Sequence, residues 1–449
     1  MERSNALDVL RTFRESLYRC FGRRADALFE LTDAILTAGV VPSPVHLSLE
    51  VVHRRGWGSL YAALNRGRID AEALRDLLAC YPLPAESATT PVYAVDVSVW
   101  SRCDAESSPE RGFYYHPSRH SAGQPIVAGW AYQLIAQLGF ARESWVAPVD
   151  VRRVRPAENS NVIAAAQVKA LVDRLPENED AIPLFVFDAG YDPVQVQQGL
   201  EGGRVQTLVR LRAGRCFYAD PVGPPAKTGR PRRHGPKLDT KDPETWPEPS
   251  VEHRCEAPGY GAVRVRAWTK LHPKTQDHST RGTRRPRPIV RGTLVLVEVS
   301  RVPRPTREPR KLWLWWAGSG EPDLDLLWRA YVRRFDLEHT FRFLKQTLGW
   351  TVPRVRHPEQ ADRWSWLILA AYMQLLLARP CVEDLRLPWE RRYAPDRLRP
   401  LRVRRSVLAL LLELGTPANP PKPCGRSPGR PKGSRSGRAR RYPAMKKTA

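Results

Sequence analysis

Three acidic residues stand where a protein could use them to hold divalent metal ions. Asp96 follows the apolar run 92–95, and Asp188 follows the apolar run 183–187. Alpha/beta sheets present their ligand-binding groups at the ends of such strands. Glu338 lies in a predicted helix from about 326 to 348. Carboxylates at such positions can hold divalent ions, so metal-dependent chemistry is one interpretation of these three residues.

The predicted helix around Glu338 places several useful groups on one face. Tyr331, Arg334, Glu338 and Lys345 are separated by three, four and seven residues, and at about 100° per residue these positions lie along one side of a helix. A carboxylate can hold a metal there while the phenol and the cations grip phosphate oxygens. The alternative is a solvated face with an Arg334–Glu338 pair at i, i+4, worth a few tenths of a kcal/mol.

The two aspartates differ in their support. Either could simply cap the turn that follows its strand. Asp188 is followed by Ala189, Gly190 and Tyr191, and the glycine permits a tight turn beside a crowded site. Asp96 has less context, and Asp104 is its distant substitute.

Composition indicates a polyanionic partner. The 449 residues carry a formal net charge of +25, far more than solubility needs, and 42% are hydrophobic, enough for two or three folded units. The most apolar stretch, 364–378, is too short to span a bilayer, and the N-terminus has no signal-peptide core. We therefore expect a cytoplasmic protein that associates with the nucleoid through DNA and has no membrane partner.

The scattered cysteines form no Cys-x-x-Cys pair, so they are expected to be reduced, and no histidine or cysteine cluster is expected to bind a softer metal.

The order of predicted elements indicates an α/β protein. Strand-like and helix-like runs alternate through the centre of the chain, basic and Pro-rich segments interrupt it, and the last part is helical before a Pro-, Gly- and Ser-rich tail. The predicted parts are a helical, DNA-binding segment 1–85; the first part of the catalytic core, 90–211; a β-rich insertion, 212–325; a helical remainder, 326–415; and a basic tail, 416–449, disordered when alone.

Three features each allow two interpretations. The helices around Leu60 and Leu74, with Asp70 as the cap between them, fit a helix-turn-helix or a plain bundle. Arg430 and Lys432 in the tail fit either a minor-groove hook or nonspecific attraction to phosphate. The nonspecific attraction is the favoured interpretation. The tryptophans at 313, 315 and 316 fit either stacking on a DNA base or packing in the core of a strand region. Packing is the favoured interpretation.

The chain resembles the insertion-sequence DDE transposases whose third acid lies in a Tyr, Arg, Glu, Lys signature. That signature runs here from Tyr331 through Arg334 and Glu338 to Lys345 with no departure in spacing. The second motif of the group, Asp-small-Gly-Tyr, matches Asp188–Tyr191; in the first, Asp96-Val-Ser lacks the second acid that often follows. The resemblance covers about 90 to 360. It implies a ribonuclease H-like mixed-sheet core, interrupted by the β-rich insertion before the Glu-bearing helix, with a helical N-terminal domain and a basic tail.

The resemblance also implies a reaction and its partners. Asp96, Asp188 and Glu338 would hold two Mg²⁺ ions, with Mn²⁺ as the alternative, and Tyr331, Arg334 and Lys345 would grip the DNA strand. The enzyme would cut double-stranded DNA at terminal inverted repeats and join the ends to target DNA, acting as a homodimer in the DNA complex. The alternative is a transposase-derived DNA-binding protein that no longer cuts; retention of all three acids argues against it.

Overall fold

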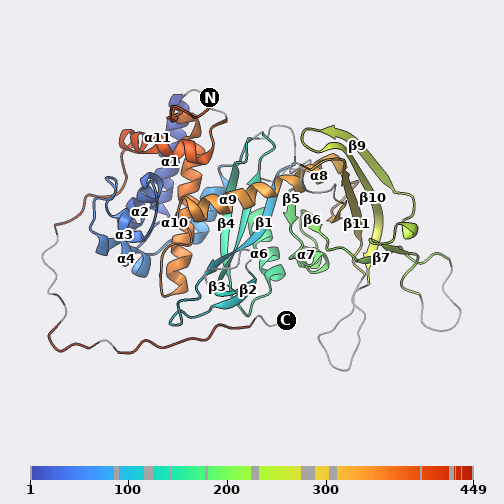
Figure 1. Ribbon diagram of the computed structural model, residues 1–449, viewed down its shortest axis with the longest axis horizontal. Coiled ribbons are helices and arrows are strands. Elements are labelled where there is room, and N and C mark those ends of the chain that lie inside the picture. Colours follow the sequence, from blue (N-terminus) through green and yellow to red (C-terminus); the bar gives the residue numbers. More distant parts are fainter. Residues whose placement is uncertain are drawn as a thin grey trace. The chain divides into compact units, whose positions relative to one another are not determined.

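The chain folds into a mixed α/β structure (Figure 1), seen in a computed structural model. The structure describes residues 3–84, 90–115, 125–141, 143–176, 181–223, 232–274, 289–302, 311–394, 397–423, 429, 431–435 and 437–446. It divides into two compact units. One comprises 1–86, 97–159 and 336–449; we call it the helical unit. The other comprises 87–96 and 160–335; we call it the sheet unit.

The sheet unit is built on parallel strands that continue into an antiparallel region. Its elements are the first half of β1 (Val92–Ser101), α6 (Ser160–Val172), β5 (Leu184–Phe187), α7 (Pro193–Gly199), β6 (Gln206–Arg210), β7 (Cys216–Tyr218), β8 (Lys237–Asp239), β9 (Val251–Ala257), β10 (Gly261–Pro273), β11 (Gly292–Val299), β12 (Lys311–Ala317) and α8 (Leu324–Arg333). β1, β5 and β6 are parallel, and β12, β11, β10 and β9 extend the sheet from β6 with antiparallel pairing. The predicted alternation of strands and helices is confirmed, because α6 and α7 separate the strands β4 (Val146–Val154), β5 and β6. Between 212 and 325 the described regular elements are mainly strands, while the bounds of an insertion stay a prediction.

Tryptophans form the centre of the antiparallel region. Trp313 and Trp315 on β12 are buried with Phe217 and Trp268 in one apolar cluster, and the rings of Phe217 and Trp315 stack with centroids 5.0 Å apart. Trp316 is buried as well, and its indole N–H donates to Gln206. The prediction that these tryptophans pack a strand core is therefore confirmed.

The helical unit combines helices from both ends of the sequence with strands from its middle. Its elements are α1 (Arg3–Arg19), α2 (Ala25–Thr37), α3 (Pro44–Leu47), α4 (Trp57–Arg66), α5 (Ala71–Ala79), the second half of β1, β2 (Gly112–Tyr115), β3 (Ile126–Leu138), β4 (Val146–Val154), α9 (Phe335–Gln346), α10 (Pro358–Ala378) and α11 (Pro400–Leu414). β3 pairs with β1 and lies antiparallel to β2 and β4. α10 contacts α1, α2, α4 and α11, which form one group of helices in Figure 1.

Buried charges connect these helices. Arg14 on α1 makes two hydrogen bonds to Asp33 on α2, at 2.7 and 2.9 Å, and a third to Gln374 on α10, at 2.6 Å. Arg404 on α11 donates to the carbonyls of Ile35, Leu36 and Gly39, at or just beyond the C-terminal end of α2. A guanidinium there satisfies carbonyls that have no partner within their own helix. Burial lowers the pKa of Arg404 to about 10, so the side chain stays charged at neutral pH.

The helix pair predicted near the N-terminus is present as α4 and α5. The Asp70 carboxylate accepts a hydrogen bond from the Ala73 backbone N–H at 3.1 Å, as its predicted cap role requires. Both helices belong to the helical unit, where α4 packs on α2 and α10 and α5 on β4. The two helices therefore pack as part of the helical unit. Recognition of DNA by this pair remains a prediction, and so do the boundaries of an N-terminal domain.

Two predicted boundaries are wrong. The helix expected from about 326 to 348 is two helices, α8 and α9, which are divided at Arg334. No Gly or Pro stands there, and the break coincides with a residue whose side chain is tied to a distant strand, as described below. β1 does not end at Asp96 but continues to Ser101, because pairing with β3 carries the strand on after pairing with β5 stops.

The described end of the tail lies along the helical unit. The backbone N–H groups of Tyr442 and Met445 donate to the backbone carbonyls of Glu106 and Arg111, both at 2.7 Å. The backbone N–H of Phe113 on β2 donates in turn to the Met445 carbonyl. Disorder of the tail remains a prediction for the segment alone, since this stretch has specific partners here. None of the helices in the described ranges combines the length and the hydropathy that a membrane span requires. The described cysteines are all free thiols, as expected.

Candidate active site

Asp96 and Asp188 lie at neighbouring positions of two parallel strands. The register pairs Val95 on β1 with Phe187 on β5, and each aspartate is the next residue along its strand direction. The pairing of β1 with β5 ends at this position, although β1 itself runs on to Ser101, so the two aspartates lie where the paired strands stop pairing. The two carboxylates predicted from sequence are therefore brought together, although they are separated by ninety-two positions in the chain.

A tight turn shapes the site after Asp188. Its Oδ1 atom accepts a hydrogen bond from the Gly190 N–H at 2.8 Å, and its carbonyl accepts from Tyr191 at 3.4 Å. A Cβ on Gly190 would lie 3.0 Å from that same carboxylate oxygen, so a side chain would crowd the turn. Asp192 then caps α7 by accepting from the N–H groups of Val194 and Gln195. The Asp-Ala-Gly-Tyr sequence thus holds one carboxylate in a defined position.

Arg334 is the direct partner of Asp96. Its guanidinium donates to Asp96 Oδ2 at 2.8 Å, and its side chain is only 4% exposed. The guanidinium also lies over the rings of Tyr331 and Phe335, at 5.7 and 5.5 Å from their centroids. A buried cation held by two rings and one carboxylate fixes the orientation of that carboxylate. In this structure Arg334 positions Asp96, and its predicted contact with DNA remains a prediction.

Tyr331 brings a buried hydroxyl to the same region. The side chain is 3% exposed, and its hydroxyl has no hydrogen-bond partner among the described residues. A buried hydroxyl without a partner costs free energy unless another group uses it. The predicted contact of the Tyr331 hydroxyl with a phosphate oxygen remains a prediction.

Tyr191 is a titratable group that the sequence did not single out for chemistry. It is buried against Phe187, with ring centroids 5.1 Å apart. Burial, and then the charges of Asp96 and Asp188, hold the pKa of Tyr191 well above its usual value, although Arg334 opposes them. The phenol therefore stays protonated through the neutral and mildly alkaline range, and it is not set up as a nucleophile.

We expect a Tyr191→Phe variant to keep its DNA cleavage rate within roughly tenfold of the wild type, because a neutral hydrogen bond contributes about 0.5–1.5 kcal/mol. The alkaline side of the pH–rate profile should not move, since the raised pKa keeps the group neutral there in the wild type as well. Initial rates measured between neutral pH and pH 10 would test this. A covalent link between Tyr191 and DNA, or a shifted alkaline limb, would contradict it.

Glu338 and Lys345 lie on α9 in the helical unit. They are seven residues apart, about two turns, so they share one side of that helix. Glu338 is exposed. The Lys345 ammonium donates to the carbonyl of Val99 on β1 at 3.1 Å, which fixes this side of α9 against the second half of the strand. The structure thus gives Lys345 a positioning contact that the sequence did not predict.

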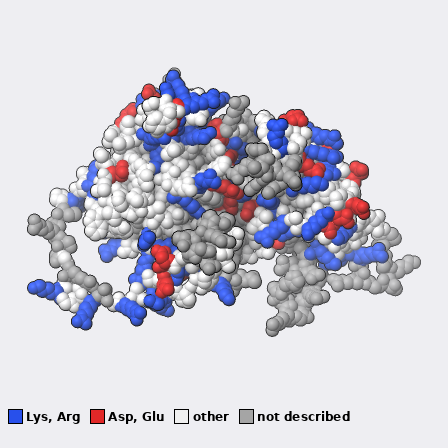
Figure 2. Space-filling model, in the orientation of Figure 1, with Lys and Arg blue, Asp and Glu red and all other residues white. Residues whose placement is uncertain are grey.

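Positive charge is spread widely over the surface. Figure 2 shows Lys and Arg side chains across much of one face, with Asp and Glu in smaller groups. In the tail, Lys432 is exposed, whereas Arg430 lies outside the described residues. Their predicted contacts with DNA remain predictions.

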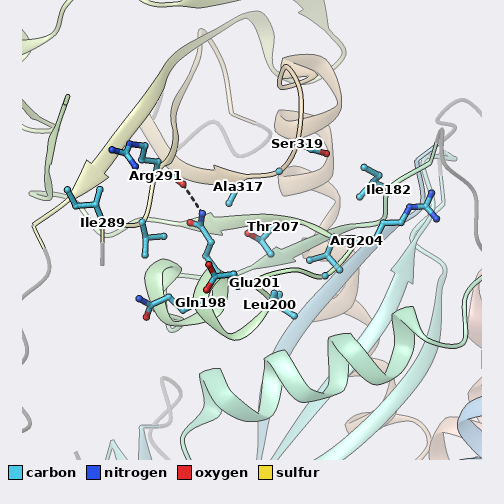
Figure 3. A pocket seen from close by; sticks show the side chains of 15 residues that line it. Ile182, Gln198, Leu200, Glu201, Arg204, Thr207, Ile289, Arg291, Ala317 and Ser319 are labelled. Atoms are coloured by element: carbon cyan, nitrogen blue, oxygen red, sulfur yellow. Dashed lines mark hydrogen bonds between the residues drawn. The ribbon is translucent and has the colours of Figure 1, made fainter. Parts of the chain in front are cut away.

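A pocket of about 510 Å³ in the sheet unit is separate from the carboxylates (Figure 3). Glu201, Arg204 and Arg291 are among its lining residues, and Gln197 donates to the Arg291 carbonyl at 2.7 Å. Asp96 and Asp188 do not line it. A single carboxylate beside two guanidinium groups is a poor site for a divalent cation, so this pocket is not a candidate for the metal-dependent chemistry.

One cluster contradicts the expectation that no histidine or cysteine group would suit a softer metal. His253, Cys255 and Asp325 bring their ligand atoms within 4.8 Å of one another. The sequence signal was available, because His253 and Cys255 are two apart in a strand and so share a face. Asp325 is seventy residues further along, and only the fold brings it near.

The geometry at Asp96 and Asp188 suits a hard divalent cation. Their donors are all carboxylate oxygens, which Mg²⁺ and Mn²⁺ prefer, and each carboxylate is already oriented by a hydrogen bond. Metal-dependent nucleases use carboxylates to hold their ions, so a pair of this kind is compatible with that class of protein.

The chain belongs to the family of DDE superfamily endonucleases, whose family model matches residues 16–287, more than half of its length. The match contains Asp96 and Asp188 and ends before Tyr331, so it does not test the Tyr, Arg, Glu, Lys signature. The observed mixed sheet is consistent with a ribonuclease H-like fold of this family. No curated protein matches the sequence.

Proposed function

We propose that the protein is a DNA transposase that cuts at the ends of a mobile element and joins those ends to target DNA. The observation that carries this proposal is the parallel register that sets Asp96 beside Asp188 in a member of the DDE endonuclease family. The strong positive charge supports a DNA substrate. The spacing from Tyr331 to Lys345 supports a transposase rather than another nuclease.

In this proposal Asp96, Asp188 and Glu338 hold two Mg²⁺ ions. When bound, such ions activate the attacking oxygen and stabilise the leaving oxygen of an in-line displacement. Arg334 orients the Asp96 carboxylate through its 2.8 Å hydrogen bond. The Tyr331 hydroxyl donates to a phosphate oxygen of the bound strand, and Lys345 holds α9 through the Val99 carbonyl.

Two successive displacements at phosphorus account for cutting and joining. In the first, water attacks the phosphodiester at the element end, the bond to the 3′ oxygen breaks, and a free 3′-hydroxyl and a 5′-phosphate result. In the second, that 3′-hydroxyl attacks a phosphodiester of target DNA and displaces the 3′ oxygen there. Each step makes one phosphorus–oxygen bond and breaks one, so no energy-carrying cofactor is required.

Removal of the metal tests the proposal. The purified full-length protein is incubated with a DNA fragment that carries the inverted repeats flanking its gene, with Mg²⁺ or with excess chelator, together with a target plasmid. We expect nicking at the repeat ends and joined products with Mg²⁺, and neither with chelator, on denaturing and agarose gels.

Each other outcome has a defined meaning. Binding in a gel-shift assay without any cleavage would overturn the catalytic proposal and leave a DNA-binding protein. Cleavage without joined products would reduce the function to that of an endonuclease. Cleavage that survives the chelator would exclude the metal-dependent reaction altogether.

A further inference from the structure

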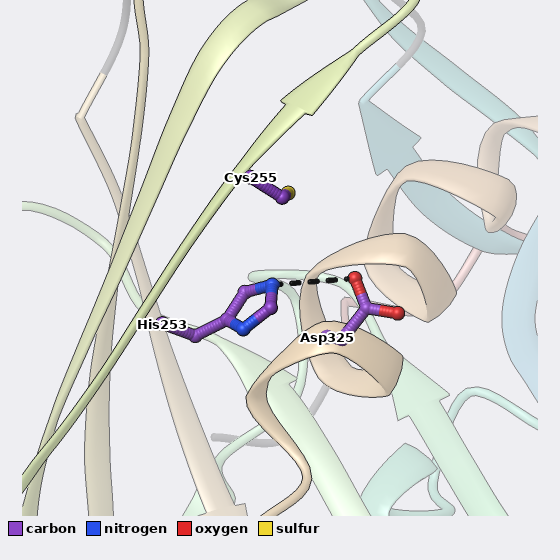
Figure 4. A group of neighbouring side chains, drawn as sticks. All are labelled: His253, Cys255 and Asp325. Atoms are coloured by element: carbon purple, nitrogen blue, oxygen red, sulfur yellow. Dashed lines mark ion pairs between the residues drawn. The ribbon is translucent and has the colours of Figure 1, made fainter.

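His253, Cys255 and Asp325 form a cluster of metal-ligating side chains within the sheet unit (Figure 4). His253 and Cys255 are alternate residues of β9, and Asp325 lies in the first turn of α8. Figure 4 shows the two strand side chains directed toward the helix. The cluster therefore lies where the antiparallel region meets the helix that carries Tyr331.

The spacing of the ligand atoms approaches that of a tetrahedral site. Zinc bonds of about 2.0 Å to nitrogen or oxygen and about 2.3 Å to sulfur place ligand atoms roughly 3.3 to 3.6 Å apart. The His253 Nε2 atom lies 3.5 Å from Asp325 Oδ1. All three ligand atoms lie within 4.8 Å of one another, so only a small closing movement of Cys255 or its neighbours is required.

The imidazole has a nitrogen that makes no hydrogen bond. His253 Nε2 is buried, and no hydrogen-bond partner for it is found in the part of the chain that the structure describes. The 3.5 Å separation from Asp325 is longer than an ordinary hydrogen bond. A metal ion beside the two atoms would give His253 Nε2 a bond that its present contact with Asp325 does not supply.

The Asp325 carboxylate is already oriented by its own helix. Its Oδ1 accepts from the Trp328 indole and its Oδ2 from Arg329, both at 3.0 Å. Such outer hydrogen bonds fix the direction of metal-binding carboxylates. Each oxygen can accept more than one bond, so Oδ1 keeps capacity for an ion on the side that faces His253.

The types of ligand select the ion. A thiolate and an imidazole favour Zn²⁺ over Mg²⁺, which prefers oxygen ligands only. Burial and the Asp325 charge raise the pKa of the Cys255 thiol, so the metal-free protein keeps a thiol, and ion binding releases its proton to solvent. The cluster thus differs in chemistry from the carboxylate pair at Asp96 and Asp188.

We propose that His253, Cys255 and Asp325 bind one Zn²⁺, with a water molecule as the fourth ligand, and that this ion fastens β9 to α8. The ion is structural and takes no part in DNA cleavage. Trp328 on α8 already packs on Tyr260, in the turn that follows β9, with ring centroids 6.1 Å apart. The ion adds a bond that does not depend on apolar contact.

Cobalt binding tests this assignment on the full-length protein. After removal of metals with a chelator, Co²⁺ is titrated in, and a sulfur-to-cobalt charge-transfer band with tetrahedral d–d bands is expected at one ion per chain; Zn²⁺ should abolish both. Cys255→Ser should lose the charge-transfer band. His253→Gln should weaken binding by roughly a hundredfold or more, because a direct ligand matters at least as much as the outer groups that change affinity 10–100-fold.

Matched cysteine variants provide the control. Cys80→Ser and Cys103→Ser remove thiols elsewhere in the chain and should leave the cobalt spectrum unchanged. Zn²⁺ should raise the thermal midpoint of the wild type and of these controls, but not that of Cys255→Ser or His253→Gln. A charge-transfer band that survives Cys255→Ser, or a wild type that binds no Co²⁺, would overturn the assignment. Mg²⁺-dependent cleavage by Cys255→Ser is expected to persist, so failure here is distinct from failure of the proposed function.

Discussion

Replacing Asp188 with asparagine or Glu338 with glutamine is expected to lower the rate of Mg²⁺-dependent DNA cleavage roughly a thousandfold, about 4 kcal/mol of transition-state stabilisation. Each change keeps the size of the side chain and removes one negative charge from the proposed metal ligands. DNA binding should remain close to that of the wild type, because neither residue is proposed to grip the phosphate backbone. Single-turnover cleavage of a labelled repeat-end fragment, with a parallel gel shift, measures both quantities.

His339→Gln is the matched control on the same helix. His339 is exposed and directly follows Glu338, so it points to a different side of α9. The His339→Gln variant should cleave DNA at close to the wild-type rate. If Glu338→Gln cleaves as fast as His339→Gln, Glu338 is not the third carboxylate. Equal activity of Asp188→Asn would remove the support that the strand register gives to the whole site.

The second large effect is on stability. Arg14→Leu should destabilise the helical unit by about 3–5 kcal/mol, because it leaves the Asp33 carboxylate buried without its ionic partner. The pair is almost completely buried, with side-chain exposures of 3% and 4%, and Arg14 also binds Gln374. The midpoint of urea unfolding, followed by circular dichroism, measures the change.

An exposed ion pair that starts from the same helix, α1, supplies the comparison. Arg3 pairs with Glu413 at 2.8 Å, and both side chains are about half exposed, at 58% and 47%. Arg3→Ala should hardly move the midpoint, because exposed pairs contribute little. In the double variant Arg14→Leu/Asp33→Leu, part of the lost stability should return, since the lone charge is then absent. If Arg14→Leu unfolds at the wild-type midpoint, the buried pair has no stabilising role.

The sequence predicted much of the sheet unit, because strand signals are local. Continuous apolar runs such as 184–187 and the alternating segments of 212–325 appear as strands, since burial on one or both faces sets these patterns. The position of Asp188 followed from its strand and from the turn that Gly190 allows.

The rest depended on contacts between distant residues. Arg334 and Asp96 are separated by 238 positions, and nothing local predicts that the arginine is buried against that carboxylate. The same contact coincides with the break between α8 and α9, which the helical periodicity alone did not predict. The His253, Cys255 and Asp325 cluster was missed for a similar reason, since the spacing of ligands across a strand and a helix leaves no pattern in one segment.

The pairing of the first helices with the last ones has a consequence for how the protein is made. Arg14 donates a hydrogen bond to Gln374, which lies 360 positions later in the sequence. The Leu36 carbonyl near the end of α2 accepts one from Arg404, which lies 368 positions later. Synthesis is vectorial, so α1 and α2 leave the ribosome long before the residues that bury them exist. During translation, the nascent N-terminal segment therefore keeps part of its apolar surface exposed to solvent. Folding of the helical unit completes only after translation has passed α11, which makes the growing chain a natural client for chaperones.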